Sequence, residues 1–310
     1  MSSDNKSIVV GLGEVLWDCF SDFRRPGGAP ANMAFHADQL GASGVVASRI
    51  GTDELGDEFA AYLTEQGLTT DYLQRDELHA TGWATVDESL PGHPDFIIHE
   101  PVAWDFLEPT ESLRELMQSA DAVCFGTLAQ RSEGTRQTIY DALAATKWDC
   151  MRVYDVNLRQ DYYRHDWIRQ SLELASAVKL NEHEAAVLGA ILEIGSPDTE
   201  DANRLAEFAK RVCEIHRLRL ACITRGAEGC VVVSGEQTVI VPGQPVNVVD
   251  SVGAGDSFTA ALVTTQLAGW SLEESAAFAN AVGGLVASQQ GAMPPLRDEY
   301  ATLKTRFHSD

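Results

Sequence analysis

The residues best suited to chemistry in this chain stand at 250–256, where the sequence reads DSVGAGD. Two carboxylates enclose a run of small residues. An apolar pattern with the spacing of one helix face follows them: Phe258, Ala261, Leu262 and Thr265. This pattern predicts an amphipathic helix that has Asp256 in its first turn.

The small residues Gly253, Ala254 and Gly255 would leave the backbone N–H groups at the start of this helix uncovered. Together with the positive end of the helix dipole, these groups would form an anion pocket. Asp256 at the mouth of the pocket suits a general base that deprotonates a hydroxyl while the N–H groups hold a transferring phosphoryl group. Taken alone, the motif is equally compatible with an aspartate that caps a helix after a glycine turn.

A second motif, GGAPAN at residues 27–32, leads into another predicted helix at 31–40. Its glycines, among them Gly28, allow the backbone to approach a ligand closely, and Asn32 offers a donor and an acceptor to a polyol. Asp18, which follows the first predicted strand, could accept hydrogen bonds from sugar hydroxyls. The alternatives are a plain junction between loop and helix for 27–32 and a solvated turn residue for Asp18.

Three more motifs each begin where a predicted strand ends: DVNLR at 155–159, NEHE at 181–184 and TRGAEG at 224–229. In a parallel sheet, ligands bind outside the carboxyl ends of the strands. There Arg159 could grip a substrate or a phosphate, and Glu184 could hold Mg²⁺ through water beside the phosphates of a nucleotide. The alternative for 181–184 is a helix start with favourable acidic residues. For 224–229, a simple hairpin and a loop against a nucleotide both stay open.

Composition narrows the classes of protein that the chain can represent. Its 310 residues are enough for one large α/β domain or two small ones, and 45% apolar and 22% charged residues are ordinary for a soluble globular protein. The formal net charge of -23 argues against nucleic acid and anionic membranes as partners, since both need a basic face. No apolar run approaches the length of a membrane span and residues 1–7 are polar, so we expect a cytoplasmic protein. The six cysteines are scattered, which favours reduced packing thiols over disulfides.

Strand and helix patterns alternate along most of the chain. We predict a helix at 54–66, a turn at 24–28 and buried strands at 8–16, 45–50, 122–126, 151–156, 177–180, 220–224, 229–234 and 238–241. Such alternation implies right-handed β-α-β units and a mostly parallel sheet that helices cover on both faces. Residues 81–86 and 96–98 form a predicted hairpin, and the segment after Leu16 is expected to join it in a small projecting sheet.

Considered together, these motifs resemble those of the phosphofructokinase-B/ribokinase family of carbohydrate kinases. Residues 27–32 match the N-terminal signature of the family and residues 250–256 match its C-terminal signature. Residues 181–184 and 224–229 match its magnesium and phosphate motif and its nucleotide strand. The resemblance covers nearly the whole chain, from residue 8 to residue 296.

The resemblance implies a single ribokinase-like domain over residues 1–310, with a three-layer α/β/α fold, a mostly parallel central sheet and a small β-lid formed by segments 14–26 and 78–104. Asp256 would be the catalytic base beside an anion hole of Gly253, Ala254 and Gly255. The residues expected to bind sugar are Asp18, Gly28, Asn32 and Arg159, and those expected to bind the nucleotide are Asn181, Thr224, Gly226, Gly229 and Asn280. Mg²⁺ would accompany ATP near Glu184. A loop that binds K⁺ in many members is similar to Asp250, Val252, Val286 and Gly291.

The substrate is less closely determined than the chemistry. Residues 13–18, 28–32 and 155–159 look most like those of fructokinases, which makes fructose the first candidate among neutral sugars. Residues 99–100 read HE where fructokinases and 2-keto-3-deoxygluconate kinases often carry an aromatic residue and an arginine. This departure weakens the case for an acidic sugar or a sugar phosphate, although Arg159 keeps an acidic sugar open.

Two further classes of function stay open. One is another kinase of the family, acting on ribose, 2-keto-3-deoxygluconate or a nucleoside. The other is a sugar-binding regulator that has lost the chemistry, although such a protein would have no need of both Asp256 and Glu184. The expected partners are ATP and a small sugar, and the lid could pair with that of a second copy in a homodimer.

Overall fold

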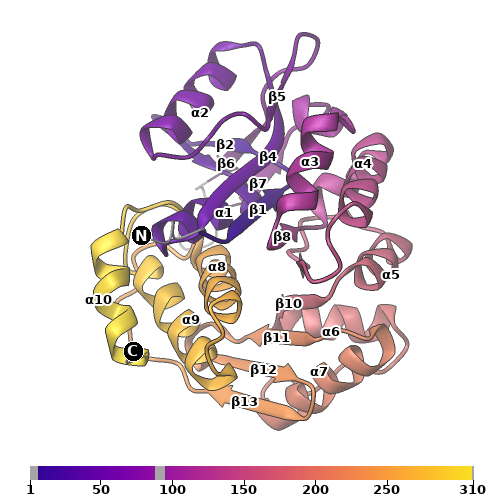
Figure 1. The fold of residues 1–310 in the computed structure, drawn as a ribbon, viewed down its shortest axis with the longest axis vertical. Coiled ribbons are helices and arrows are strands. Elements are labelled where there is room, and N and C mark those ends of the chain that lie inside the picture. The colour runs from indigo at the N-terminus through magenta and orange to yellow at the C-terminus, as the bar shows by residue number, and fades with distance from the viewer. Residues whose placement is uncertain (1–5, 88–94, 309–310) are drawn as a thin grey trace.

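The computed structural model of the protein describes residues 6–87 and 95–308. In this part of the chain, nine strands form one sheet in the order β13-β12-β11-β10-β9-β8-β1-β4-β5 (Figure 1). They are β1 (Ile8–Leu12), β4 (Ser43–Gly51), β5 (Leu73–Asp76), β8 (Ala122–Phe125), β9 (Met151–Asp155), β10 (Ala177–Asn181), β11 (Leu220–Thr224), β12 (Cys230–Ser234) and β13 (Gln237–Val241). Neighbouring strands run parallel from β11 to β5, whereas β12 and β13 are antiparallel to their neighbours. The predicted, mostly parallel sheet is therefore confirmed.

Each face of this sheet carries its own layer of helices, because alternate residues of a strand point to opposite faces. In β1, Val10 and Leu12 join one core cluster, whereas Val9 joins another. The first cluster includes residues of α3 (Glu111–Ser119), α4 (Glu133–Ala144), α5 (His165–Leu174), α6 (Glu182–Ile191) and α7 (Ala202–His216). The second includes residues of α1 (Ala29–Gln39), α8 (Ala254–Leu267), α9 (Leu272–Ala287) and α10 (Arg297–Phe307). Figure 1 shows α3–α7 and α8–α10 on opposite sides of the sheet, as expected for a three-layer fold.

The remaining helices complete the two layers. The helix predicted at 54–66 is α2 (Glu54–Glu65), and it packs Phe59 and Leu63 against β4. Two short 3₁₀ turns, η1 (Ala103–Phe106) and η2 (Leu128–Arg131), precede α3 and α4, and a third, η3 (Gly226–Glu228), follows β11. In the described residues, no helix is both long and apolar enough to cross a membrane.

A second sheet begins just after β1 and contains β2 (Leu16–Cys19), β3 (Arg24–Gly27), β6 (Trp83–Asp87) and β7 (Asp95–Ile98), in the order β3-β2-β6-β7. The predicted hairpin is confirmed by the antiparallel pairing of β6 with β7. The turn predicted at 24–28 is wrong, because most of that segment forms β3, in which Arg25 lies opposite Asp18 of β2. Pro26 lacks an N–H group but is tolerated because β3 is an edge strand.

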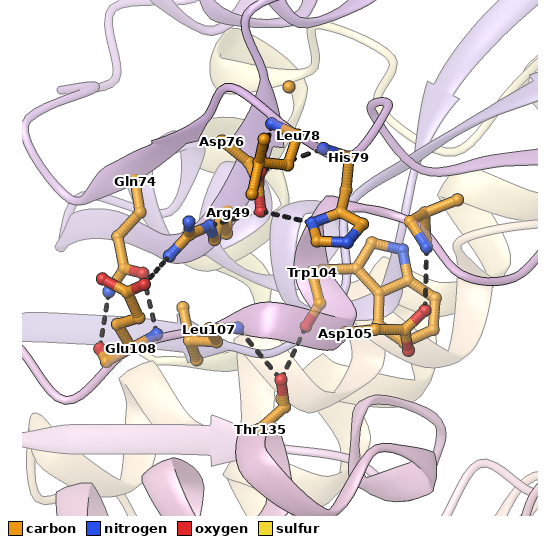
Figure 2. A network of polar contacts seen from close by, with 12 residues as sticks. Arg49, Gln74, Asp76, Leu78, His79, Trp104, Asp105, Leu107, Glu108 and Thr135 are labelled. Atoms are coloured by element: carbon orange, nitrogen blue, oxygen red, sulfur yellow. Dashed lines mark hydrogen bonds and ion pairs between the residues drawn. The ribbon is translucent and has the colours of Figure 1, made fainter.

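Hydrogen bonds tie the chain that enters this small sheet to β4 of the main sheet and the chain that leaves it to α4 (Figure 2). Asp76 accepts two backbone N–H groups of the following turn at 2.8 and 3.0 Å, and pairs with Arg49 of β4 at 2.9 Å. Burial alone would raise the pKa of Asp76, but these hydrogen bonds and the charge of Arg49 lower it to about 2. Further along, Thr135 of α4 accepts the N–H of Leu107 and donates to the carbonyl oxygen of Trp104. Both ends of the segment that contains β6 and β7 are thus anchored.

Candidate active site

Two adjoining cavities open at the carboxyl ends of the parallel strands. The larger one has a volume of about 540 Å³ and lies between η3, the chain at 243–248 and the helices α8 and α9. The other has a volume of about 420 Å³ and lies between the small sheet and the start of α8, and we call it the polar cavity because charged side chains line it. Thr224, Ser251 and Gly255 line both. The two cavities therefore meet at the chain that leads into α8.

The four predicted sugar-binding residues meet in the polar cavity although they are far apart in the sequence. Asp18 comes from β2 and Asn32 from α1, while Arg159 follows β9. Gly28 caps α1 with a φ of 104°, and a Cβ atom there would lie 2.6 Å from the carbonyl oxygen of Glu14. Glycine is therefore required where the chain turns beside the cavity.

Asp256 lines the same cavity from the first turn of α8. Asn32 Nδ2 donates a hydrogen bond of 2.7 Å to Asp256 Oδ2, while Asn32 Oδ1 is buried without a partner in the described residues. Burial first, and then the carboxylate of Asp155, raise the pKa of Asp256. Lys179 and the Asn32 hydrogen bond lower it in part. A carboxylate with a raised pKa accepts a proton more readily, as a general base must.

Gly253, Ala254 and Gly255, the predicted anion hole, lie together at the start of α8. Gly253 caps the helix with a φ of 80°, and a Cβ atom there would lie 2.6 Å from a neighbouring backbone segment, so a side chain is excluded. The N–H of Ser257 donates to the carbonyl oxygen of Gly253 at 2.9 Å, and the N–H of Ala254 donates to Ser251 at 3.3 Å. The N–H groups of Gly255 and Asp256 lie in the first turn of the helix, where they can donate hydrogen bonds to a ligand.

A buried ion pair that the sequence analysis did not single out lies beside this helix start. Lys179 Nζ, on β10, is 3.1 Å from both carboxylate oxygens of Asp155, on β9, and Thr259 donates to the same carboxylate at 3.0 Å. A Cβ atom on Gly255 would lie only 3.0 Å from Lys179 Nζ. Burial opposes the charge on Lys179, but the surrounding carboxylates, Asp155 first, raise its pKa. In the sequence, the sign of this ion pair is the presence of a lysine inside an otherwise apolar strand.

Glu14 is a further cavity residue that the sequence analysis treated only as part of a motif. It is buried, lines the polar cavity, and its Oε2 atom has no hydrogen-bond partner within residues 6–87 and 95–308. Burial first, and also the carboxylate of Asp256, raise the pKa of Glu14 to about 7. A buried oxygen without a partner is unfavourable, and a ligand hydroxyl in the cavity could satisfy it. The signal for this residue was a single acidic side chain in the otherwise apolar run at 8–16.

Glu184 and Asn181 form a capping box at the start of α6. Glu184 Oε2 accepts the Asn181 N–H and Asn181 Oδ1 accepts the Glu184 N–H, both at 2.8 Å, while Glu184 Oε1 accepts the N–H of Leu158 at 3.0 Å. Both side chains border the polar cavity rather than the larger one. In the part of the chain that the structure describes, no three acidic, histidine or cysteine side chains gather as a metal-binding group. The prediction that Glu184 acts as an outer partner of Mg²⁺ concerns an ion that phosphate oxygens and water would mainly hold.

The other predicted nucleotide residues line the larger cavity together: Thr224, Gly226, Gly229 and Asn280. Gly229 has a φ of 91°, and a Cβ atom there would lie 2.0 Å from the carbonyl oxygen of Val241. Its glycine is thus required for packing against β13. Asn280 Nδ2 donates to the carbonyl oxygen of Pro242 at 3.2 Å and so holds one wall of the cavity.

The residues that resemble a K⁺ loop are only partly brought together. Asp250, Val252 and Gly291 line a third cavity of about 420 Å³ beside the small sheet. Asp250 accepts the N–H groups of Val252 and Gly291 at 3.0 and 3.1 Å. Val286 is buried in α9, and its carbonyl oxygen accepts the N–H of Gln289 at 2.9 Å.

Comparison with known proteins decides the family. A model of pfkB family carbohydrate kinases matches residues 8–299. The chain belongs to the pfkB family. It is 31% identical to a fructokinase of Escherichia coli, over 90% of this chain and 92% of the relative. It is 29% identical to an uncharacterized sugar kinase of Pyrococcus horikoshii, over 96% of each chain, and the crystal structure of that protein has a TM-score of 0.81. A 2-dehydro-3-deoxygluconokinase of Thermotoga maritima shares the fold, with a TM-score of 0.84 at 20% identity, over 96% of this chain and 99% of that one.

As a pfkB kinase, the protein is an ATP-dependent sugar kinase, so its site has to bring a nucleotide and a sugar into contact. The geometry provides two cavities that meet at Gly255. Asp256 lies on the polar side of that junction, next to the predicted sugar-binding residues.

Proposed function

We propose that this kinase transfers the γ-phosphoryl group of ATP to a primary hydroxyl of a neutral sugar, with fructose as the first candidate and Asp256 as the general base. The observation that carries the proposal is the position of Asp256. It borders the polar cavity, accepts a hydrogen bond from Asn32, and directly follows Gly255, where the two cavities meet. A sugar hydroxyl in the polar cavity and a phosphoryl group from the larger cavity would meet beside this carboxylate.

In the reaction, Asp256 accepts the proton of the sugar hydroxyl as the hydroxyl oxygen forms a bond to the γ-phosphorus. The bond from the γ-phosphorus to the bridging oxygen breaks, and its electron pair leaves with ADP. The N–H groups of Gly255 and Asp256, with the charge of Lys179 nearby, stabilise the equatorial oxygens. Mg²⁺ bound with ATP supplies further positive charge at the phosphates.

The charges of the polar cavity favour a neutral sugar over an acidic one. The carboxyl groups of Glu14, Asp18 and Asp256 line it, while Lys179 is engaged in its ion pair. Arg159 is the other cationic side chain in the described lining of the cavity. An acidic sugar would therefore face more carboxyl groups than uncompensated cations, whereas the hydroxyls of a neutral sugar could donate to Glu14 and Asp18. The identity to the fructokinase of Escherichia coli supports fructose within this class.

We place the sugar against the small sheet, which would act as the lid. Leu16 of β2, Ala84 of β6 and Ile98 of β7 line the polar cavity from that side. These apolar side chains would exclude water from the reacting groups and so limit ATP hydrolysis. Ile97, the neighbour of Ile98 on β7, is exposed instead, and in a homodimer it could pack against the lid of a second copy.

The test of the substrate is ADP release from Mg-ATP with a panel of acceptors: fructose, ribose, 2-keto-3-deoxygluconate, fructose 6-phosphate and a nucleoside. We expect fructose to give the highest kcat/KM. A higher kcat/KM with 2-keto-3-deoxygluconate or with the sugar phosphate would contradict the charge argument. Turnover of the nucleoside alone would show that the acceptor is a nucleoside and not a free sugar.

The test of the base is Asp256→Asn, compared with Asp298→Asn at the exposed start of α10. Loss of a general base commonly lowers kcat by about 10²–10⁴, so D256N should lose turnover while it still binds sugar in a calorimetric titration. D298N should behave as the unmodified enzyme. Retained turnover in D256N would show that Asp256 is not the base.

A further inference from the structure

Two groups that carry negative charge lie close together next to the chain that leads into α8. One is the carboxylate of Asp250. The other is the C-terminal end of α9, whose last residue, Ala287, accepts the N–H groups of Val249 and Asp250 at 2.9 and 3.2 Å. The C-terminus of a helix carries a partial negative charge. This negative charge is close to the anion hole and would oppose phosphate binding unless a cation neutralises it.

Arg25 of β3 supplies that cation. Its Nη1 atom is 3.2 Å from Asp250 Oδ2, and both side chains are partly buried. The guanidinium also lies over the rings of Phe20 and Phe23, at 5.3 and 4.8 Å from their centroids, and the two rings stack on each other at 4.4 Å. The ion pair and the cation–π contacts together fix the position of the guanidinium.

With Arg25 in this position, the contacts of Asp250 do not fit a bound monovalent cation. Asp250 Oδ1 accepts the N–H of Val252, and Asp250 Oδ2 accepts the N–H of Gly291 as well as the Arg25 hydrogen bond. The carbonyl oxygen of Val286 accepts a backbone N–H of the next turn. A K⁺ ion beside Asp250 would also be repelled by the charge of the guanidinium.

We propose that Arg25 takes the place of a monovalent cation in this kinase and holds the loop at 250–253 in the geometry that the anion hole needs. Arg25 lines the third cavity rather than the polar one, so it is a positioning residue that acts through Asp250. It also lies opposite Asp18 in the small sheet. The ion pair therefore ties the loop at 250–253 to β3, whose neighbour β2 lines the polar cavity through Asp18. The proposal rests on the sugar kinase activity of the family and is independent of which sugar is used.

The kinetic test compares Arg25→Gln with Arg24→Gln, whose arginine precedes it on β3 but pairs with Glu58 of α2. ADP release is measured with a saturating accepted sugar in KCl and in tetramethylammonium chloride at equal ionic strength. The unmodified enzyme and R24Q should have the same kcat in both salts. Without K⁺, the kcat of R25Q should fall about tenfold to a hundredfold, which is a smaller fall than the one that follows removal of a direct anion-hole donor. Addition of K⁺ should restore part of this kcat. Arg25→Lys, which keeps the charge, should remain active without K⁺.

A second measurement needs no turnover and so separates this proposal from the choice of sugar. Thermal unfolding is followed in the same two salts without substrate. The Tm of R25Q should be higher in KCl than in tetramethylammonium chloride, because Asp250 no longer pairs with an arginine and can bind K⁺. The Tm of the unmodified protein should be the same in both salts. Strong K⁺ activation or K⁺-specific stabilisation of the unmodified enzyme would overturn the proposal. An R25Q variant with unchanged kcat and no response to K⁺ would overturn it as well.

Discussion

Asn32 Nδ2 and Asp256 Oδ2 are 2.7 Å apart, although 224 positions separate the two residues in the sequence. The hydrogen bond joins the first turns of α1 and α8 and fixes one carboxylate oxygen of the proposed base. Asn32 Oδ1 stays buried beside the polar cavity without a partner in the described residues, so a sugar hydroxyl could donate to it. Asn32 is thus placed to orient both the base and the substrate.

Replacement of Asn32 by alanine should therefore change the pH dependence as well as the affinity. The hydrogen bond favours the ionised form of Asp256 and lowers its pKa, so its loss should raise that pKa further. The acidic limb of the kcat profile should move to higher pH, and KM for the sugar should rise. Asn203→Ala on the exposed face of α7 is the control. An unchanged acidic limb in N32A would mean that the hydrogen bond does not tune the base.

Two glycines with nearly the same positive φ allow a matched test of the anion hole. Gly253 has a φ of 80° and Gly269 a φ of 79°, but a Cβ atom would meet backbone at 2.6 Å in the first case and open space in the second. Alanine should cost about 1–2 kcal/mol of stability at Gly269, because an L-residue is strained at this positive φ, with little effect on kcat. At Gly253 it should displace the start of α8 and lower kcat by about 10²–10³, the range seen when an oxyanion donor is lost. Equal kcat in the two variants would argue against an anion hole at this turn.

Most of the fold could be predicted because the apolar patterns are strong and their spacing is regular. The strands predicted at 122–126, 151–156 and 177–180 are β8, β9 and β10. Two of the errors fall on edge strands. β3 contains arginines and a proline, and β5 reads LQRD, so their stability comes from pairing with a neighbour and leaves no apolar run in the sequence. The strand predicted at 8–16 is in fact β1 followed by β2 of the other sheet.

The site could be predicted only where its residues belong to a local motif. Gly253 and Gly28 were found because glycines ahead of a helix have a recognisable local pattern. The pairs Lys179–Asp155 and Arg25–Asp250 join segments that are far apart in the chain, and a charged side chain in a strand carries no local sign of its partner. Such pairs become visible only when the sheet brings strand ends together.

Removal of the buried ion pair should separate its structural effect from its electrostatic effect. Lys179→Met leaves Asp155 buried and unpaired, which commonly costs about 3–5 kcal/mol of stability. The double variant Asp155→Asn with Lys179→Met should recover much of that loss. Its kcat should nevertheless remain low, because the variant lacks the positive charge of Lys179 beside the anion hole. The Nζ atom of Lys179 lies 3.0 Å from the position that a Cβ atom on Gly255 would occupy. Denaturant unfolding and ADP release on the same samples measure the two effects. Full recovery of kcat in the double variant would show that Lys179 serves stability alone.

Replacement of Glu14 by glutamine should change how stability depends on pH. Burial raises the pKa of Glu14 from 4.5 to about 7, so between these values the folded protein binds a proton that the unfolded chain has released. The contribution of this group is therefore fully present below pH 4.5 and is lost as the pH rises through 7. Glutamine keeps the shape and stays neutral. The Tm of E14Q minus that of the unmodified protein should therefore increase between about pH 5 and about pH 8. Titrating groups that do not interact with Glu14 cancel in this difference, so a Tm difference that is constant with pH would mean that Glu14 ionises in the folded protein as readily as in water.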